Sequence, residues 1–118
     1  MTEDDLKKRT KQFALRVMTL AHALPKSPVG GIIARQMIRS GTSVGANYRA
    51  ACRARSKAEF IAKLGTVAEE ADESAYWLEL VMEGKLLNPN LVQALYDEAN
   101  QLTAIVTSSI KSSKKDVD

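Results

Sequence analysis

A helical repeat of apolar residues is the feature that most constrains this 118-residue chain. In its first segment, apolar residues recur at spacings of seven, four, three and four, which places them on one face of an α-helix. These residues are Leu6, Phe13, Val17, Leu20 and Leu24. Three later segments carry a similar stripe, and no segment has the pattern of a strand. The chain is therefore predicted to be all-α.

Strong helix-start signals divide the chain into four segments. Ser27-Pro28 and Asn88-Pro89 each place a capping residue before a proline at the first helical position, and Ser56 with Glu59 forms a capping box. The predicted helices are 3–23, 28–54, 57–83 and 89–112, followed by a polar tail at 113–118. Because the connections are short, we expect an antiparallel up-down-up-down four-helix bundle that forms one domain over residues 1–118.

The weakest point of the predicted helices is the stretch from Ser40 to Gly45, where two glycines and three hydroxyl residues lower helix propensity. We expect a continuous but bent helix there, with a short break as the second possibility. Small side chains at these positions would also let a neighbouring helix approach closely. The stretch lacks the Gly-Lys-Ser/Thr ending of a phosphate loop and the strand that precedes one.

Little in the sequence suggests catalysis. The only histidine is His22, the only cysteine is Cys52, and no cluster has the spacing of a metal site. Cys52 is interpreted as a small buried residue; the alternative is a thiol whose pKa is lowered by neighbouring arginines. We therefore expect a protein that is not an enzyme and uses no cofactor or metal.

The N-terminal segment and the overall hydropathy bear on where the protein works. The first twelve residues are charged and lack the apolar core of a signal peptide. No apolar run approaches the ~20 residues that a membrane-spanning helix needs. The expected location is the cytoplasm, without a membrane partner.

Basic residues of the second predicted helix suggest a binding surface. With ~100° per residue, four arginines fall within about 40° of one stripe, and two further cations extend it past the end of the helix. The six candidate nucleic-acid contacts are Arg35, Arg39, Arg49, Arg53, Arg55 and Lys57. Guanidinium groups fork onto phosphate oxygens, so this stripe suits a nucleic-acid backbone. The alternatives are a solvated face, or pairing with the acids of the third helix.

The third predicted helix is acidic, and opposite charges on different faces of one domain can pair between subunits of a ring. Trp77 lies about 100° from the centre of this helix's apolar seam, so it either anchors an interface or widens the core. The candidate interface residues are Trp77, Glu69 and Glu73.

Two segments resemble a known family. Ser40–Asn47 and Arg55–Phe60, followed by Leu64 and an acidic helix, are similar to small four-helix-bundle proteins, some of which are encoded in intervening sequences of bacterial large-subunit ribosomal RNA genes. The family pattern Arg-Ser-x-x-Glu-Phe is matched in full within the second segment. The chain departs from the family at Tyr48–Ala51, where Ala50 stands in place of an acidic residue.

The resemblance implies a left-handed antiparallel bundle that assembles into a homopentamer. Similar accessory proteins of diversity-generating retroelements form pentamers that bind nucleic acid and a reverse transcriptase. We therefore expect a homo-oligomer that binds structured RNA, or DNA, through its basic stripe. The alternative is a protein-interaction scaffold, such as an accessory subunit of a retroelement reverse transcriptase.

Overall fold

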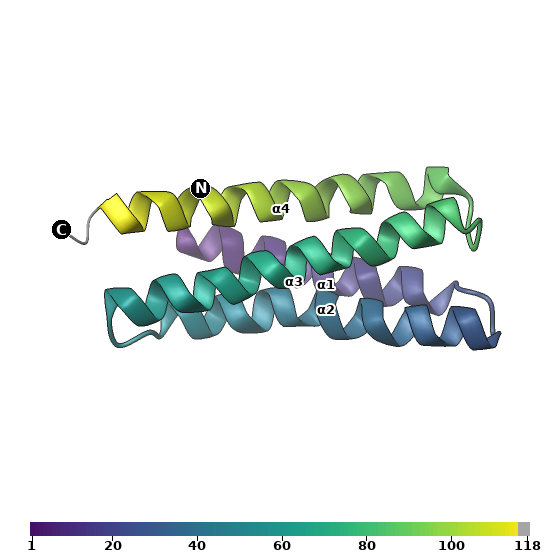
Figure 1. Ribbon diagram of the computed structural model, residues 1–118, viewed down its shortest axis with the longest axis horizontal. Coiled ribbons are helices and arrows are strands. Elements are labelled where there is room, and N and C mark those ends of the chain that lie inside the picture. The colour runs from purple at the N-terminus through teal and green to yellow at the C-terminus, as the bar shows by residue number, and fades with distance from the viewer. Residues whose placement is uncertain (116–118) are drawn as a thin grey trace.

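Four long helices make up the computed structural model, which describes residues 1–115 (Figure 1). They are α1 (Glu3–His22), α2 (Pro28–Cys52), α3 (Lys57–Glu83) and α4 (Pro89–Lys115). Within the described residues there is no strand. Each helix packs mainly against its neighbours in sequence, and α1 and α4 make the loosest pair. The predicted all-α four-helix bundle is confirmed.

Helix starts follow the capping signals of the sequence. The Thr2 hydroxyl accepts from the Asp5 backbone N–H at 3.1 Å, and the Asp5 carboxylate accepts from the Thr2 N–H at 3.0 Å. The Ser27 and Ser56 hydroxyls cap α2 and α3 by accepting backbone N–H groups at 3.1 and 3.0 Å. Each bond satisfies a donor that has no partner inside its helix.

Helix ends agree less well with the sequence predictions. α1 and α2 end at His22 and Cys52, one and two residues early, whereas α4 continues to Lys115. The prediction of a polar tail from 113 was therefore wrong for its first three residues, and 116–118 lie outside the described residues. No glycine or proline interrupts the end of α4, and Lys114 and Lys115 in its last turn favour the negative pole of the helix.

α2 runs without a break through the glycine-containing stretch, and its small residues let α1 approach closely. A Cβ atom added at Gly41 would lie 2.8 Å from Val17 Cγ1, and one added at Gly45 would lie 3.2 Å from Thr10 Oγ1. The predicted close approach of a neighbouring helix is thus confirmed.

The core is mostly aliphatic, and its largest fully buried side chains include Phe13, Met37, Leu64, Leu78 and Leu102. Leu91 continues the apolar stripe of the fourth helical segment, but it is not in the core. Leu91 is 65% exposed, because it lies in the first turn of α4 where α1 and α4 do not close on each other.

Arg9 forms the main polar link between α1 and α4. Its Nε and Nη2 donate to the two carboxylate oxygens of Glu98, each at 2.7 Å.

The bundle measures 50 × 20 × 20 Å, so its two ends lie far apart. The loops 23–27 and 84–88 share one end, and the loop 53–56 lies at the other, together with the start of α1 and the end of α4 (Figure 1).

Candidate nucleic-acid interface and assembly surfaces

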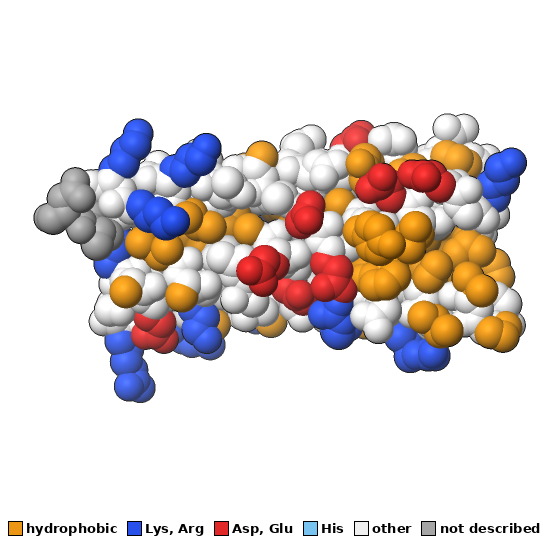
Figure 2. Space-filling model, viewed as in Figure 1, with side chains coloured by type: hydrophobic (Ala, Val, Ile, Leu, Met, Phe, Trp, Pro, Cys, Tyr) orange, Lys and Arg blue, Asp and Glu red, His pale blue; other side chains and the backbone are white. Residues whose placement is uncertain are grey.

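Charge is divided unequally along the bundle. We call residues 1–12, 42–69 and 102–115 the basic half; it holds twelve lysines and arginines against five acids, a net +7. We call residues 13–41 and 70–101 the apolar half; it holds five lysines and arginines against seven acids, a net −2. Figure 2 shows basic side chains toward the left and a broad hydrophobic area at the right. A modest overall charge of +3 thus conceals one strongly positive end.

Exposed large hydrophobic residues follow the opposite distribution. Of those in the described residues, all except Met1 belong to the apolar half. They are Leu15, Met18, Val29, Ile32, Ile38, Tyr76 and Leu91. Single exposed apolar residues are common on proteins, but their confinement to one half of the molecule distinguishes its two ends.

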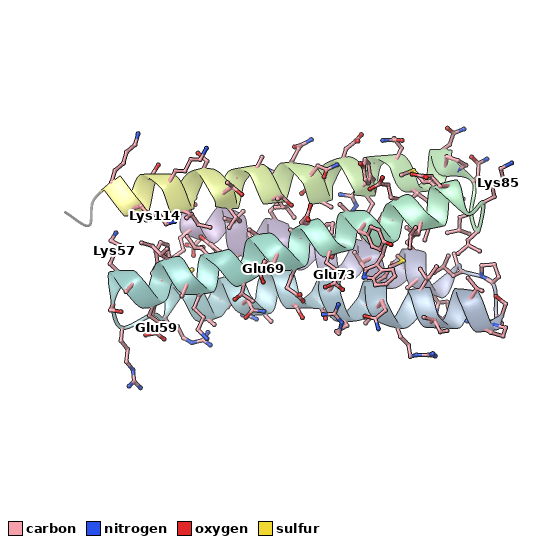
Figure 3. All side chains as sticks on the ribbon, in the orientation of Figure 1. Lys57, Glu59, Glu69, Glu73, Lys85 and Lys114 are labelled. Atoms are coloured by element: carbon pink, nitrogen blue, oxygen red, sulfur yellow. The ribbon has the colours of Figure 1, made fainter. Side chains whose placement is uncertain are left out.

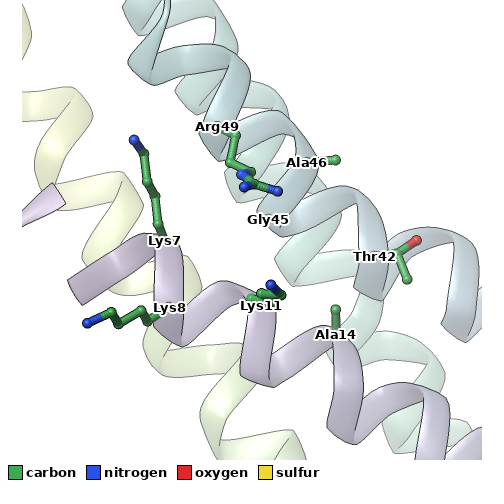
Figure 4. A pocket seen from close by; sticks show the side chains of 8 residues that line it. All are labelled: Lys7, Lys8, Lys11, Ala14, Thr42, Gly45, Ala46 and Arg49. Atoms are coloured by element: carbon green, nitrogen blue, oxygen red, sulfur yellow. The ribbon is translucent and has the colours of Figure 1, made fainter. Parts of the chain in front are cut away.

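A cationic groove lies between α1 and α2 in the basic half (Figure 4). Arg49 reaches over it from α2, and Lys7, Lys8 and Lys11 project from α1. Its volume is about 350 Å³. The remaining lining residues are the small Ala14, Thr42, Gly45 and Ala46. The close approach that Gly41 and Gly45 permit therefore places cations of two helices around one groove, although the Lys8 side chain is directed away from α2 (Figure 4).

The groove cations are largely uncompensated. Lys7 Nζ lies 3.3 Å from Glu3 Oε1, an exposed pair of the kind that contributes at most about 1 kcal/mol. Within the described residues, Lys8, Lys11 and Arg49 form no ion pair. These three side chains can therefore meet a phosphate without first breaking an internal contact.

Four of the six predicted nucleic-acid contacts lie in the basic half. Arg49, Arg53, Arg55 and Lys57 are exposed, and their side chains form no ion pair with the described residues. Lys57 Nζ lies 5.9 Å from the centre of the Phe60 ring, a cation–π distance.

The remaining two predicted contacts, Arg35 and Arg39, lie in the apolar half. Arg39 turns toward α3, where it pairs with Glu70 at 3.1 Å and with Glu73. Pairing with the acids of the third helix, an alternative left open by the sequence, thus holds for Arg39. The predicted stripe is split, because Arg39 faces α3 while Arg49 faces α1.

The lysines of α1 were missed by the sequence reasoning. Their signal is the run Lys7-Lys8-Arg9-Thr10-Lys11, with Lys7 and Lys11 one turn apart on one face of the helix. Only the packing of α1 against α2 shows that this face adjoins Arg49.

The predicted interface residues are partly brought together. Trp77 Nε1 donates to Glu73 Oε2 at 2.9 Å, and the same carboxylate pairs with Arg39. The exposed Tyr76 ring meets Trp77 edge-on, with 5.3 Å between ring centres. Glu69 is exposed and takes no part in this cluster. Figure 3 labels Glu69 and Glu73 at separate positions along α3.

Cys52 is half-buried against the core, and this burial raises the pKa of its thiol. The alternative of a lowered pKa was wrong, and the structure agrees with a small packing residue. His22 is exposed at the end of α1. Among residues 1–115, no group of three or more His, Cys, Asp or Glu side chains is placed to hold a metal ion.

In the part of the chain that the structure describes, no helix combines the length and the apolar character needed to cross a membrane.

The fold and the site define a small all-α four-helix-bundle protein with a cationic groove at one end and exposed apolar surface at the other. The family model described as 23S rRNA-intervening sequence protein matches residues 3–108. The chain belongs to this family, which confirms the expected resemblance.

A solved structure supports the same assignment. It is the crystal structure of a protein of unknown function from the S23 ribosomal protein family of Bacteroides thetaiotaomicron. The two sequences are 32% identical, the match covers 94% of this chain and 99% of the other, and the TM-score is 0.86. No curated protein matches the chain.

Proposed function

We propose that this chain is a non-enzymatic, homo-oligomeric bundle, expected to be a pentamer, that binds structured RNA or another nucleic acid through its basic half. The observation that carries the proposal is the net charge of +7 on that half, with Lys8, Lys11 and Arg49 around one groove forming no ion pair with residues 1–115. Nucleic-acid affinity arises largely from phosphate contacts by lysine and arginine, which release counterions.

Contacts under this proposal come from three helices and the loop after α2. Arg49 of α2 and Arg53, which follows the last residue of α2, carry the centre of the surface. Arg55 of the loop and Lys57, the first residue of α3, extend it, and Lys11 stands for the lysines of α1. Arg35 and Arg39 contribute least, because they belong to the half whose net charge is −2 and Arg39 is held by two acids.

The test compares two double charge reversals that change the net charge equally. Arg49→Glu with Arg53→Glu should weaken binding to a structured RNA hairpin by about 100-fold at moderate salt, because it removes and repels phosphate contacts. Lys26→Glu with Lys85→Glu alters two exposed lysines of the apolar half and should change affinity by less than about threefold. Circular dichroism and oligomer mass should be unchanged in both. Equal affinities of the two variants would refute the proposal.

How far the site extends along α2 is measured by single variants. Arg35→Glu should cost much less affinity than Arg49→Glu, since it lies roughly 20 Å along the helix from Arg49. Equal losses would extend the contact surface over the whole predicted stripe.

A second candidate function is a protein-interaction scaffold, such as an accessory subunit of a reverse transcriptase. The exposed Tyr76 beside Trp77 favours it, because aromatic residues are common anchors of protein interfaces. A well-formed oligomer that fails to bind RNA or DNA even at low salt would favour this candidate over the first.

A further inference from the structure

The cationic groove between α1 and α2 carries charges on both of its sides (Figure 4). Lys7 and Lys11 line it from α1, and Arg49 lines it from α2, with Arg53 four residues further along the chain. A step of four residues advances about 6 Å along a helix, which is close to the separation of successive phosphates in one nucleic-acid strand. The spacing of the cations therefore suits a single phosphodiester backbone that lies along the groove.

Small side chains form the floor of the groove and leave depth for a backbone. They are Ala14 of α1 and Thr42, Gly45 and Ala46 of α2. The Thr42 hydroxyl donates to the Ile38 carbonyl oxygen at 2.6 Å, so it is committed to its own helix. The eight lining residues include no Asn, Gln, Asp or Glu, the side chains that pair with adenine and cytosine edges. The groove thus supplies charge for phosphates and few groups that read bases.

The aromatic side chains of the basic half are committed to the fold. Tyr48 is 7% exposed and belongs to the core. Phe60 is half-buried against the core, and Lys57 Nζ lies 5.9 Å from the centre of its ring. Proteins that hold single strands gain much of their affinity from bases that stack on exposed aromatic rings. A single strand in this groove would have its phosphates contacted and its bases unsupported.

A double helix meets the same groove at a lower cost. Base pairing already stacks its bases and fixes the spacing of its phosphates, whereas a flexible strand must be ordered on binding, which subtracts from affinity. The cations of the groove project from helices that are themselves continuous over Glu3–His22 and Pro28–Cys52. Proteins recognise double-stranded RNA mostly through its shape and its backbone.

We propose that the α1–α2 groove seats one strand of a double helix, with Lys7, Lys11 and Arg49 on its phosphates and without reading its base sequence. The chemistry recognised is the phosphodiester backbone of paired strands, which RNA and DNA share. Unpaired strands bind more weakly at the same place. This inference rests on the proposed nucleic-acid binding, and it specifies the class of ligand and where that ligand lies.

The first experiment compares the affinity of the wild-type protein for four ligands by fluorescence anisotropy at moderate salt. They are an RNA duplex, a DNA duplex of the same sequence, an RNA duplex of scrambled sequence, and an RNA strand that cannot pair with itself and has the same number of phosphates. The two RNA duplexes should differ by less than about threefold, because phosphate contacts carry no sequence information.

The tighter of the RNA and DNA duplexes should bind at least about tenfold more tightly than the unpaired strand, because the groove gives unpaired bases nothing to stack on. A preference between the RNA and DNA duplexes would support the proposal and identify which of the two backbones is the ligand. An unpaired strand that binds as tightly as the duplexes would overturn the proposal. So would a scrambled duplex that loses more than threefold in affinity.

The second experiment locates the ligand with two double charge reversals in the basic half. Lys11→Glu with Arg49→Glu alters both sides of the groove, and Lys114→Glu with Lys115→Glu alters exposed lysines at the end of α4 by the same charge. The groove variant should lose about 100-fold in duplex affinity and the α4 variant less than about tenfold. Circular dichroism should show unchanged helicity in both, since all four side chains are exposed. Equal losses would overturn the groove as the seat.

Failure of this inference can be told apart from failure of the proposed function. A protein that binds none of the four ligands at low salt, and no RNA hairpin, would refute nucleic-acid binding itself. Tight binding that makes no distinction between paired and unpaired strands, or that survives the groove reversal, would refute only the assigned ligand class or its place.

Discussion

The two halves of this bundle share the same four helices and one continuous core, yet they present different chemistry to solvent. The basic half carries a net +7 and, apart from Met1, none of the exposed large hydrophobic residues; the apolar half carries a net −2 and all the others. Electrostatic contacts are screened by salt, whereas apolar contacts are not. Under the proposed function, the difference assigns polyanion binding to the basic half and leaves the apolar half free for other contacts.

The largest expected difference between the two halves is in their response to salt. If six cations contact phosphates, RNA affinity should fall by about 10³-fold between about 50 and about 200 mM salt, while the oligomer mass stays constant. Fluorescence anisotropy and native mass measurements on the same samples check both quantities. Loss of mass in step with affinity would mean that the two halves do not act separately.

Gly41 lies where the halves meet, and it controls the spacing of α1 and α2. Gly41→Ala should destabilise the fold by about 1–2 kcal/mol, because its Cβ would lie 2.8 Å from the buried Val17 side chain. Gly65→Ala is the matched control. Its Cβ meets nothing within 4 Å, so it should stabilise the fold by about 0.5–1 kcal/mol through helix propensity. Urea unfolding measures both, and changes of the same sign would contradict the close-approach argument.

Lys85 lies two residues beyond the end of α3, in the apolar half, and its backbone is left-handed, at φ 56°. The cap carries two bonds, from Leu86 N–H to Val81 O at 3.0 Å and from Lys85 N–H to Met82 O at 3.2 Å. Lys85→Gly should therefore stabilise the protein by about 0.5–1 kcal/mol in thermal or urea unfolding. Lys85→Ala keeps a Cβ and should give no such gain; an equal gain would mean that loss of the charge is responsible.

Asp5 caps α1 in the basic half, and here the expected effect is the smallest. The hydrogen bonds from the Thr2 backbone N–H and hydroxyl hold the pKa of the Asp5 carboxyl below its ordinary value of 3.8. A carboxyl whose pKa is lower in the folded than in the unfolded state stabilises the fold at pH values above the unfolded pKa. This stabilisation is lost as the pH falls through the folded-state pKa. The stability difference between wild type and Asp5→Asn should thus shrink on acidification below about pH 4. In a Thr2→Ala background, this pH dependence should become smaller but persist, because the backbone N–H of residue 2, the larger cause of the lowered pKa, remains.

Helix positions could be predicted from the sequence because their signals are local. Ser27, Ser56 and Asn88 each precede a helix that begins at the predicted residue. Ends were less predictable, since a helix stops where packing and capping permit. Gly84 follows the last residue of α3, but it is Lys85 that adopts the left-handed conformation that glycine usually takes.

The candidate site was predictable only in part. Helical periodicity predicted that the arginines of the second helix belong to the site. It did not predict the lysines of α1, because Arg49, which lines the same groove, lies about 40 residues further along the chain. The pairing of Arg39 with Glu70 and Glu73 likewise required the rotation of α2 relative to α3. Leu91 matched the apolar pattern yet borders an open groove, since periodicity does not report whether a neighbouring helix covers a face.

The sequence by itself determined the four helices and their N-terminal caps, because capping and amphipathic periodicity act within a few residues of one segment. The short connections gave the order of the helices in the bundle, and two short motifs gave the family. Only the tertiary structure decided which side of each helix meets which neighbour. The absence of side chains at Gly41 and Gly45 lets α1 pack closely on α2, so the lysines of α1 and Arg49 line the same groove. The looser pairing of α1 with α4 leaves leucines in solvent. Both outcomes depend on how four helices share one core, and that information is spread over the whole chain.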